Sequence, residues 1–356
     1  MALIEDLMRY AEDRGVDLVG CTHVEPFFVG EERRKVDPRD AMANAETFVI
    51  AACYMYGFDT AEPSQPGRPR GRLGPWTRGS MAAVGHGERT LRRFFEERGF
   101  KALPVGDFPL KMAAVRSGVA FYGKNSIVHA DGFGSYLKFS AILTNAKLDC
   151  VDRPVETSDC GDCTACVAAC PTNALAEPVR LNRSRCITDM FWGRPIPREL
   201  RPKTNGYIFR CGFCQDACPK NHGLKPRAAW PFPLDGPTDR PELIPLLLGD
   251  EGYYRAALPE FALRAGIDTL RRNVAIALGN SGDPAAVPAL IHALRLRHTE
   301  TRAATAWALA RLGRAETLAA LESALEAEPD HEVRAEIADA LAQVRAREGR
   351  ECHEPR

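Results

Sequence analysis

The spacing of hydrophobic positions divides the chain into an α/β part followed by a helical part. Apolar residues recur at helical spacing in residues 3–11, whereas residues 16–21 and 47–53 are apolar runs typical of buried strands. Residues 90–98 predict another helix and residues 136–143 another strand. This alternation predicts an α/β layer structure for roughly the first 150 residues.

Toward the C-terminus the pattern becomes an internal repeat. Segments beginning at Leu270, Thr301 and Val333 align with a period of 31 to 32 residues, and each has an arginine at its second position. Such self-similarity predicts an all-α, HEAT-like solenoid, although the period is short for that class. A solenoid offers an extended surface to a macromolecule; the alternative is a domain that only stabilises the rest of the chain.

The resulting domain organisation has four parts. A Pro-rich stretch before the repeat predicts a linker, and a cysteine-rich stretch precedes that linker. We predict an α/β catalytic domain at 1–149, a double-cluster ferredoxin-like domain at 150–225, a linker at 226–241 and the helical repeat domain at 242–346.

Composition sets limits on the partners. The 356 residues include 47 basic and 47 acidic side chains, so no net charge attracts nucleic acid or acidic lipid, and a polyanion site must be a local patch. No segment predicts a membrane span. The repeat arginines either contact phosphates or form a solvated charged face, and they are Arg271, Arg272, Arg295, Arg297 and Arg302.

The cysteines carry the clearest chemical signal. Residues 160–171 have the CxxCxxCxxxCP spacing of a ferredoxin-type iron-sulfur site, residues 211–219 repeat its later part, and Cys186 lies between them. Eight thiols match the needs of two [4Fe-4S] clusters. The predicted ligands are Cys160, Cys163, Cys166 and Cys218 for one cluster and Cys170, Cys186, Cys211 and Cys214 for the other.

Other roles for cysteine fit this spacing less well. Zinc knuckles also use CxxC pairs, but an extra cysteine and the CP endings favour iron-sulfur chemistry. The N-terminus has no apolar signal segment, so we expect a cytoplasmic protein in a reducing compartment, without disulfides. The four remaining cysteines are expected to be buried or incidental, and they are Cys21, Cys53, Cys150 and Cys352.

Several of these motifs together resemble the epoxyqueuosine reductase family. The resemblance rests on the run from Cys160 to Leu175, on the CxxCQxxCPxN run ending at Asn221, and on LRRNVAIALGNSGDP from Leu270. It implies that an N-terminal domain binds cobalamin, that two [4Fe-4S] clusters supply its electrons, and that the repeat helps to hold tRNA. The implied reaction reduces epoxyqueuosine to queuosine at the tRNA wobble position.

The N-terminal part departs from the family pattern. Residues 84–89 stand where the family has a GRDYH-like stretch, and the segment around Asp107 is shorter than the family's. This segment stands where the family has its catalytic aspartate, so the resemblance makes Asp107 a candidate for the general acid that protonates the epoxide oxygen. The alternative role of Asp107 is the N-cap of the following helix.

A Gly-Lys turn supplies the candidate cofactor contacts. Residues 121–126 stand where the family has GWxGKN or GWxGKH, and Tyr122, Lys124 and Asn125 are the candidate cobalamin-binding residues. The alternative is an ordinary turn between secondary-structure elements. The chain has no DxHxxG motif, so no histidine ligand to cobalt is expected.

The leading hypothesis is a monomeric, cobalamin-dependent iron-sulfur reductase acting on tRNA, supplied by an external low-potential donor of the flavodoxin or ferredoxin type. One alternative is a related reductase with another substrate, such as an organohalide or a different modified nucleoside. Another is a pure electron carrier, although such a carrier has no need of the first 150 or so residues.

Overall fold

A computed structural model of the protein describes residues 3–30, 32–57, 63–155, 160–177 and 179–351. The chain forms two compact units. The first comprises Met1–Phe58, Gly79–Asn182 and Gly212–Asp235, and the second comprises Asp59–Arg78, Arg183–Cys211 and Gly236–Arg356. In the described ranges, no helix is long and apolar enough to cross a membrane.

A four-stranded antiparallel sheet organises the first unit. Its strands, in spatial order, are β1 (Leu18–His23), β4 (Thr47–Tyr54), β9 (Leu137–Thr144) and β6 (Ala102–Pro104). The three longer strands confirm the predictions from apolar runs. Every residue of β4 is buried, because both faces of the sheet are covered.

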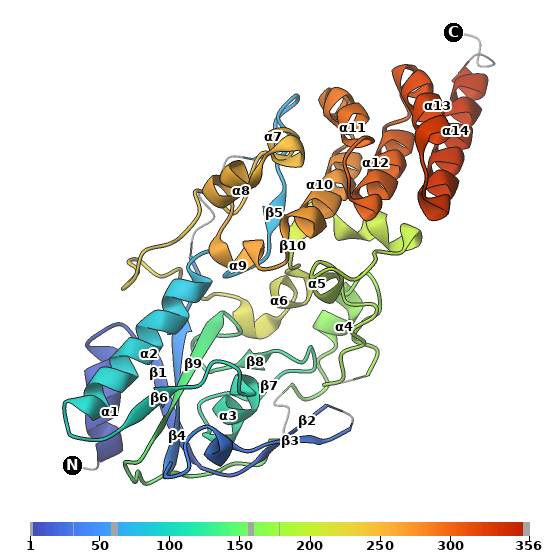
Figure 1. Cartoon of the computed structure of the whole chain (residues 1–356). Coiled ribbons are helices and arrows are strands. Elements are labelled where there is room, and N and C mark those ends of the chain that lie inside the picture. The colour runs from blue at the N-terminus through green and yellow to red at the C-terminus, as the bar shows by residue number, and fades with distance from the viewer. Residues whose placement is uncertain (1–2, 31, 58–62, 156–159, 178, 352–356) are drawn as a thin grey trace. The chain divides into compact units, whose positions relative to one another are not determined.

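Alternate residues of β4 serve the two faces. Phe48 and Ile50 join the core that also includes residues of α3 (Leu110–Arg116), while the thiol of Cys53 donates to the carbonyl of Ala83 at 3.8 Å on the opposite face. That second face is covered by α1 (Leu3–Glu12) and α2 (Ser80–Glu96). The arrangement confirms the α/β layer structure (Figure 1).

Helix α2 begins ten residues before its predicted start. Gly85 and Gly87 weaken the helical pattern of residues 80–89, because glycine is a poor helix former. Packing explains Gly87: a Cβ at this position would lie 2.1 Å from the hydroxyl oxygen of Ser140 on β9. Close contact with the sheet therefore overrides the local sequence preference.

Short elements complete the first unit, and the predicted linker begins within it. These elements are β2 (Phe27–Val29), β3 (Arg34–Val36), β7 (Phe121–Tyr122), β8 (Val128–His129), α4 (Ala165–Ala169) and α6 (Phe213–Asp216). Residues 226–235 contain no helix or strand, yet Arg227 pairs with Asp17 and donates to the carbonyl of Tyr54 at 3.1 Å. This part of the linker is thus anchored to the sheet.

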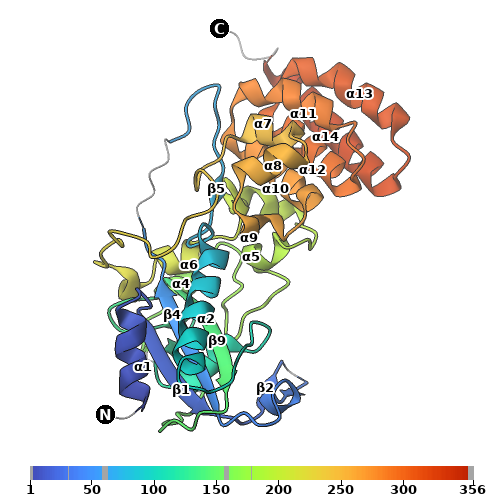
Figure 2. The ribbon, with the colours of Figure 1, turned by 60° about the vertical axis from the view of Figure 1, so that its left-hand side comes forward.

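The second unit is dominated by the helical repeat (Figure 2). Helices α10 (Ile267–Ser281), α12 (Thr299–Leu312) and α14 (His331–Glu351) pack in succession, and α11 (Val287–Ala293) and α13 (Leu318–Ala327) pack against them. Gly279 allows the close approach of α10 to α12, because a Cβ there would lie 2.8 Å from the Cα of Ala308. The solenoid prediction is confirmed.

The remaining elements of the second unit precede α10. A parallel pair of short strands joins β5 (Arg72–Leu73) to β10 (Tyr207–Phe209). The amide of buried Asn273 in α10 donates to the carbonyl of Ile208 in β10 at 2.9 Å. The other helices are α5 (Ile187–Met190), α7 (Leu243–Leu248), α8 (Glu251–Ala257) and α9 (Glu260–Leu263).

Candidate functional site

Four predicted cluster ligands lie together in the first unit. Burial raises the pKa of the Cys166 thiol, and the nearby thiols of Cys218, Cys160 and Cys163 raise it further. Four thiolates so close together repel one another unless a cationic centre neutralises them, so this donor set fits an iron-sulfur cluster. We call these four residues the first cluster site.

The first cluster site does not have the arrangement expected around a single ion. Among the described residues, no three or more His, Cys, Asp or Glu side chains form a group that would hold a metal ion.

Backbone amides surround the thiols of this module. Burial raises the pKa of Cys218, whereas hydrogen bonds from the backbone amides of Lys220 and Asn221 lower it. The amide of Ala174 donates to the sulfur of Cys170 at 3.3 Å. Such N–H donors stabilise thiolate ligands and raise cluster potentials.

The other four predicted ligands are divided between the units. Cys170 and Cys214 belong to the first unit, and Cys186 and Cys211 belong to the second. Within the second unit, the hydroxyl of Thr188 lies 3.5 Å from the sulfur of Cys211 and accepts a hydrogen bond from its backbone amide at 3.0 Å. The ligand set of this second cluster remains a prediction.

A buried polar network anchors the second cysteine run to the sheet domain. The Asn221 side-chain oxygen accepts from the amide of Ser135 at 2.8 Å, and its nitrogen donates to the carbonyl of Gln215 at 2.8 Å. Gln215 in turn donates to the hydroxyl of Ser135 at 2.9 Å. Gln215 and Asn221 belong to the CxxCQxxCPxN motif, but their partner Ser135, some 80 residues away, was not identified from sequence.

Two candidate cofactor residues instead contact the cysteine loops. The ammonium of Lys124 donates to the carbonyl of Gly161 at 2.5 Å, between Cys160 and Cys163. The amide nitrogen of buried Asn125 donates to the carbonyl of Cys214 at 3.4 Å, and its oxygen accepts from the amide of Ile127 at 3.1 Å. Both polar ends of Asn125 are thus engaged by the protein.

The third candidate, Tyr122, keeps a hydroxyl that makes no hydrogen bond within the described residues. Burial raises its pKa to about 12, so the phenol is neutral. An apolar ring with a neutral hydroxyl suits contact with a corrin and its amide side chains. Of the three candidates, Tyr122 fits cobalamin best.

A buried histidine lies beside this turn. His129 is 1% exposed, and burial, with help from Lys220, lowers its pKa to about 4, so the ring is neutral. Its Nε2 lies 3.4 Å from the side-chain oxygen of Asn125, while its Nδ1 is buried without a hydrogen-bond partner among the described residues. The ring stacks on Phe121.

Asp107 is exposed in the loop between β6 and α3. The alternative capping role is wrong, because Pro109 occupies the N-cap position of α3 and no side chain caps the helix there. A second carboxyl faces this loop: a Cβ on Gly106 would lie 3.9 Å from an oxygen of Glu88. Burial raises the pKa of Glu88 against the opposing effect of Arg89 and Arg92.

The remaining cysteines do not all match expectation. Cys21 and Cys150 form a disulfide that joins β1 to the segment after β9, so the prediction of a chain without disulfides is wrong for this pair. Their separation of 129 residues hides the pairing from sequence inspection. Cys53 is buried as expected, and burial raises its pKa to about 12. Cys352 lies outside the described residues.

The repeat arginines fall into two groups. Arg272 is 2% exposed and pairs with Glu300 at 2.6 Å, and Arg302 is 9% exposed and pairs with Glu328 at 2.6 Å. Neither belongs to a solvated face, and neither is available to phosphate. For these two residues, the predicted phosphate contact and the alternative of a solvated charged face are therefore both wrong.

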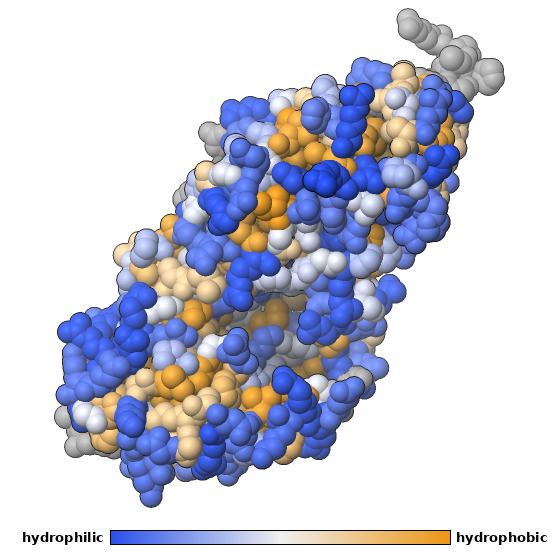
Figure 3. All heavy atoms as spheres, viewed as in Figure 1, coloured by the Kyte–Doolittle hydropathy of each residue, from blue (hydrophilic) through white to orange (hydrophobic). Residues whose placement is uncertain are grey.

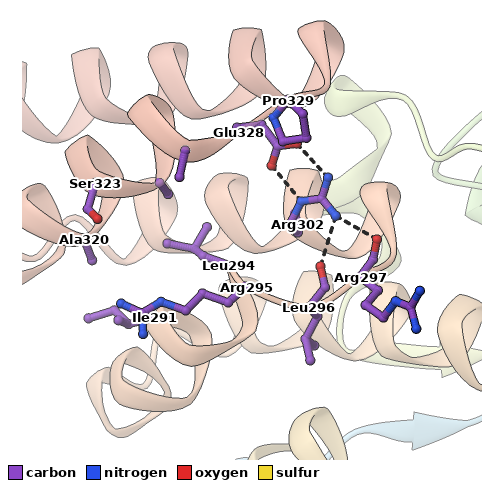
Figure 4. A pocket seen from close by; sticks show the side chains of 12 residues that line it. Ile291, Leu294, Arg295, Leu296, Arg297, Arg302, Ala320, Ser323, Glu328 and Pro329 are labelled. Atoms are coloured by element: carbon purple, nitrogen blue, oxygen red, sulfur yellow. Dashed lines mark hydrogen bonds and ion pairs between the residues drawn. The ribbon is translucent and has the colours of Figure 1, made fainter.

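The in-register arginines share one structural task. Arg302 donates to the carbonyls of Leu296 and Arg297 at 3.0 and 2.8 Å (Figure 4). Its counterparts also reach carbonyls that precede their own helices: Arg271 donates to Gly249, and Arg334 donates to Leu325. Arg302 and Arg334 thus bind the segment that leads into their own helix, Arg334 also through the carbonyl of Glu328 at 3.1 Å, whereas Arg271 binds the segment between α7 and α8.

Arg295 and Arg297 behave differently. Both are exposed, and they border a cavity of about 360 Å³ between α11 and α13, whose wall is a mixture of polar and apolar groups. In Figure 4 the guanidinium of Arg297 points away from the Arg302–Glu328 pair. On the face in Figure 3, hydrophilic side chains of the repeat unit alternate with apolar patches. These two arginines remain candidates for a polyanion contact.

Comparisons with known proteins cover nearly the whole chain. Residues 159–221 match the model of the 4Fe-4S double cluster binding domain, and residues 239–342 match that of HEAT repeats. The epoxyqueuosine reductase of Bacillus subtilis is 27% identical over 377 residues, covering 97% of this chain and 96% of the relative.

Solved structures give the same result. A crystal structure of selenomethionine-labelled epoxyqueuosine reductase matches with a TM-score of 0.85 and 25% identity, over 96% of this chain and 99% of that one. A crystal structure of epoxyqueuosine reductase with an epoxyqueuosine-modified tRNA stem loop matches with a TM-score of 0.84, 25% identity and the same coverage.

Proposed function

Since this chain belongs to the epoxyqueuosine reductase family, we propose that it reduces epoxyqueuosine to queuosine at the wobble position of tRNA. The observation that carries the proposal is the double-cluster module, joined to a sheet domain and a helical repeat that match the relatives over almost their full length. One matching structure contains the modified tRNA stem loop itself. An iron-sulfur reductase, and not a passive electron carrier, accounts for all these parts.

The reaction needs electrons and protons from outside the substrate. Conversion of the epoxide to a carbon–carbon double bond consumes two electrons and two protons and releases the oxygen as water. We propose that a flavodoxin or ferredoxin type of donor supplies the electrons through the two clusters. The thiols of the first cluster site, held by burial and by N–H donors, would ligate one cluster.

Cobalamin is the cofactor that the family uses at the substrate, and it supplies a strongly reducing cobalt centre. Among this chain's residues we propose Tyr122 as a contact to the corrin. Lys124 and Asn125 are less suited to that role, because each already donates to a carbonyl of a cysteine loop.

The proton donor to the epoxide oxygen is proposed to be Asp107. An exposed carboxyl must be desolvated when tRNA covers the loop before it becomes a useful acid at neutral pH. Single-turnover reduction by Asp107→Asn, compared with Glu88→Gln, tests the assignment. Loss of rate in Asp107→Asn alone supports it; full rate in that variant removes Asp107 from the role.

Arg295 and Arg297 are the proposed phosphate contacts in the repeat. Their exposed guanidiniums bring positive charge to a protein without net charge, beside a cavity of mixed polar and apolar lining. The protein is proposed to act as a monomer in the cytoplasm. Its zero net charge does not oppose a local contact with tRNA.

The decisive experiment is turnover. Protein reconstituted with iron, sulfide and cobalamin is incubated with a low-potential reductant and epoxyqueuosine-containing tRNA, and the nucleosides are analysed by mass spectrometry. Queuosine is the expected product. Fully loaded protein that leaves the epoxide intact but turns over an organohalide or another modified nucleoside would establish the alternative substrate class instead.

A further inference from the structure

The turn between β7 and β8 touches both cysteine runs in the first unit. Lys124 binds the carbonyl of Gly161 in the first run, and Asn125 binds the carbonyl of Cys214 in the second. The turn itself is tightly built, since the amide of Ser126 donates to the carbonyl of Gly123 at 2.9 Å. It is therefore a fixed platform between the two loops.

Gly123 makes this compact turn feasible. A Cβ at this position would lie 2.7 Å from Nε2 of His129 and 2.9 Å from the side-chain oxygen of Asn125. The absence of a side chain leaves Asn125 room to reach Cys214 while His129 stays buried beside it. The geometry of Asn125 is thus set by its neighbours and does not depend on a bound corrin.

Lys124 carries the charge of the platform. Gly161 lies one residue after Cys160, so the ammonium sits within the loop that presents the first cluster site. Reduction of a cluster adds one negative charge at that site. A nearby cation stabilises this added charge, and local charge and hydrogen bonding are the means by which proteins tune cluster potentials.

We propose that Lys124 raises the reduction potential of the first cluster site relative to the other cluster and so fixes the direction of electron flow between them. Lys124 is then a positioning residue for the electron path and not a cobalamin ligand. The inference rests on the proposed electron-transfer function, but its test requires neither cobalamin nor tRNA.

The test is a potential measurement on the variant Lys124→Gln. Full-length protein is reconstituted with iron and sulfide, and both midpoint potentials are determined by titration monitored with electron paramagnetic resonance. The midpoint potential of the first cluster site should become more negative, while that of the other cluster should stay unchanged. The expected shift is a roughly tenfold fall in the reduced-to-oxidised ratio at fixed applied potential, equivalent to about 59 mV for one electron.

Two controls separate charge from structure. Lys124→Arg keeps the cation and should retain the wild-type potentials. Lys111→Gln removes an ammonium that donates to the carbonyl of Ser126 in the same turn, at 3.2 Å, and it should leave both potentials unchanged.

Several outcomes overturn the proposal. Unchanged potentials in Lys124→Gln, or an equal shift in Lys111→Gln, would show that Lys124 has no specific influence. If Lys124→Gln fails to hold iron, Lys124→Met, which keeps the aliphatic stem, replaces it; loss of iron there as well would assign Lys124 to loop structure alone. Failed queuosine formation with a shifted potential would contradict the proposed substrate and leave this inference standing.

Discussion

The buried ion pairs within the helical repeat and the polar contacts of the cluster module join residues at very different distances along the chain. In the repeat unit, Arg302 pairs with Glu328 and Arg272 with Glu300, separated by 26 and 28 residues. In the first unit, Asn125 and Ser135 reach Cys214 and Asn221, separated by 89 and 86 residues. The repeat is stabilised by contacts between successive helices, whereas the cluster module depends on contacts that form only when the whole unit folds.

The strongest way to test this difference is to remove a buried charge from the repeat. Arg302→Met leaves the Glu328 carboxylate buried without its partner, and we expect a loss of about 3–5 kcal/mol in the stability of the repeat unit. Urea unfolding followed by circular dichroism measures this loss. The iron of the first cluster site should stay bound, because its four cysteines lie in the first unit and this ion pair lies in the second.

The same pair predicts a pH effect. Arg302 lowers the pKa of Glu328 below its ordinary value of 4.5, so the pair's contribution is fully present above pH 4.5 and is lost as the pH falls through the lower, folded-state pKa. The double variant Arg302→Met with Glu328→Leu should lose this acid sensitivity and recover most of the stability. An equally unstable double variant would contradict the assigned cause.

In the first unit, the disulfide is the corresponding long-range constraint. Cys150→Ser should cost about 2–4 kcal/mol, because the Cys21–Cys150 bond restricts the unfolded chain. Thermal unfolding with and without dithiothreitol measures the effect. The reductant should lower the midpoint of the wild type but not that of Cys150→Ser; a wild-type midpoint indifferent to reductant would show that the isolated protein carries two free thiols.

A smaller loss is expected from the polar network around Ser135. Asn221→Ala leaves the amide and hydroxyl of Ser135 without one of their partners, which should cost about 1–3 kcal/mol. Iron retained per chain after gel filtration provides a second readout, because Asn221 also helps to place a backbone donor at Cys218. Full iron content in a destabilised variant would separate folding from cluster binding.

These contrasts explain what the sequence could predict. The strands of the sheet and the repeat follow from local patterns of apolar residues, and the cysteine spacing predicts an iron-sulfur module, whereas the ligand set of each cluster stays a prediction. The partners of Lys124 and Asn125 and the Cys21–Cys150 bond do not, because they join segments whose proximity only the folded unit establishes. Even in the repeat, the pattern located Arg302 but gave no sign that Glu328 would bury it.

The smallest expected effect concerns the two arginines that the repeat leaves exposed. Each of Arg295→Gln and Arg297→Gln should reduce the salt dependence of tRNA binding by about one unit of slope in log K against log salt, with little loss of stability. Arg314→Gln, which removes an exposed arginine outside the cavity lining, is the matched control and should keep the wild-type slope. The guanidinium of Arg302 is already bound to Glu328 and to backbone carbonyls. A variant at that position should therefore lower the free energy of unfolding and leave the salt dependence of tRNA binding unchanged. Equal slopes in the wild type, Arg295→Gln, Arg297→Gln and Arg314→Gln would place the tRNA contact elsewhere. The repeat would then have a structural role only.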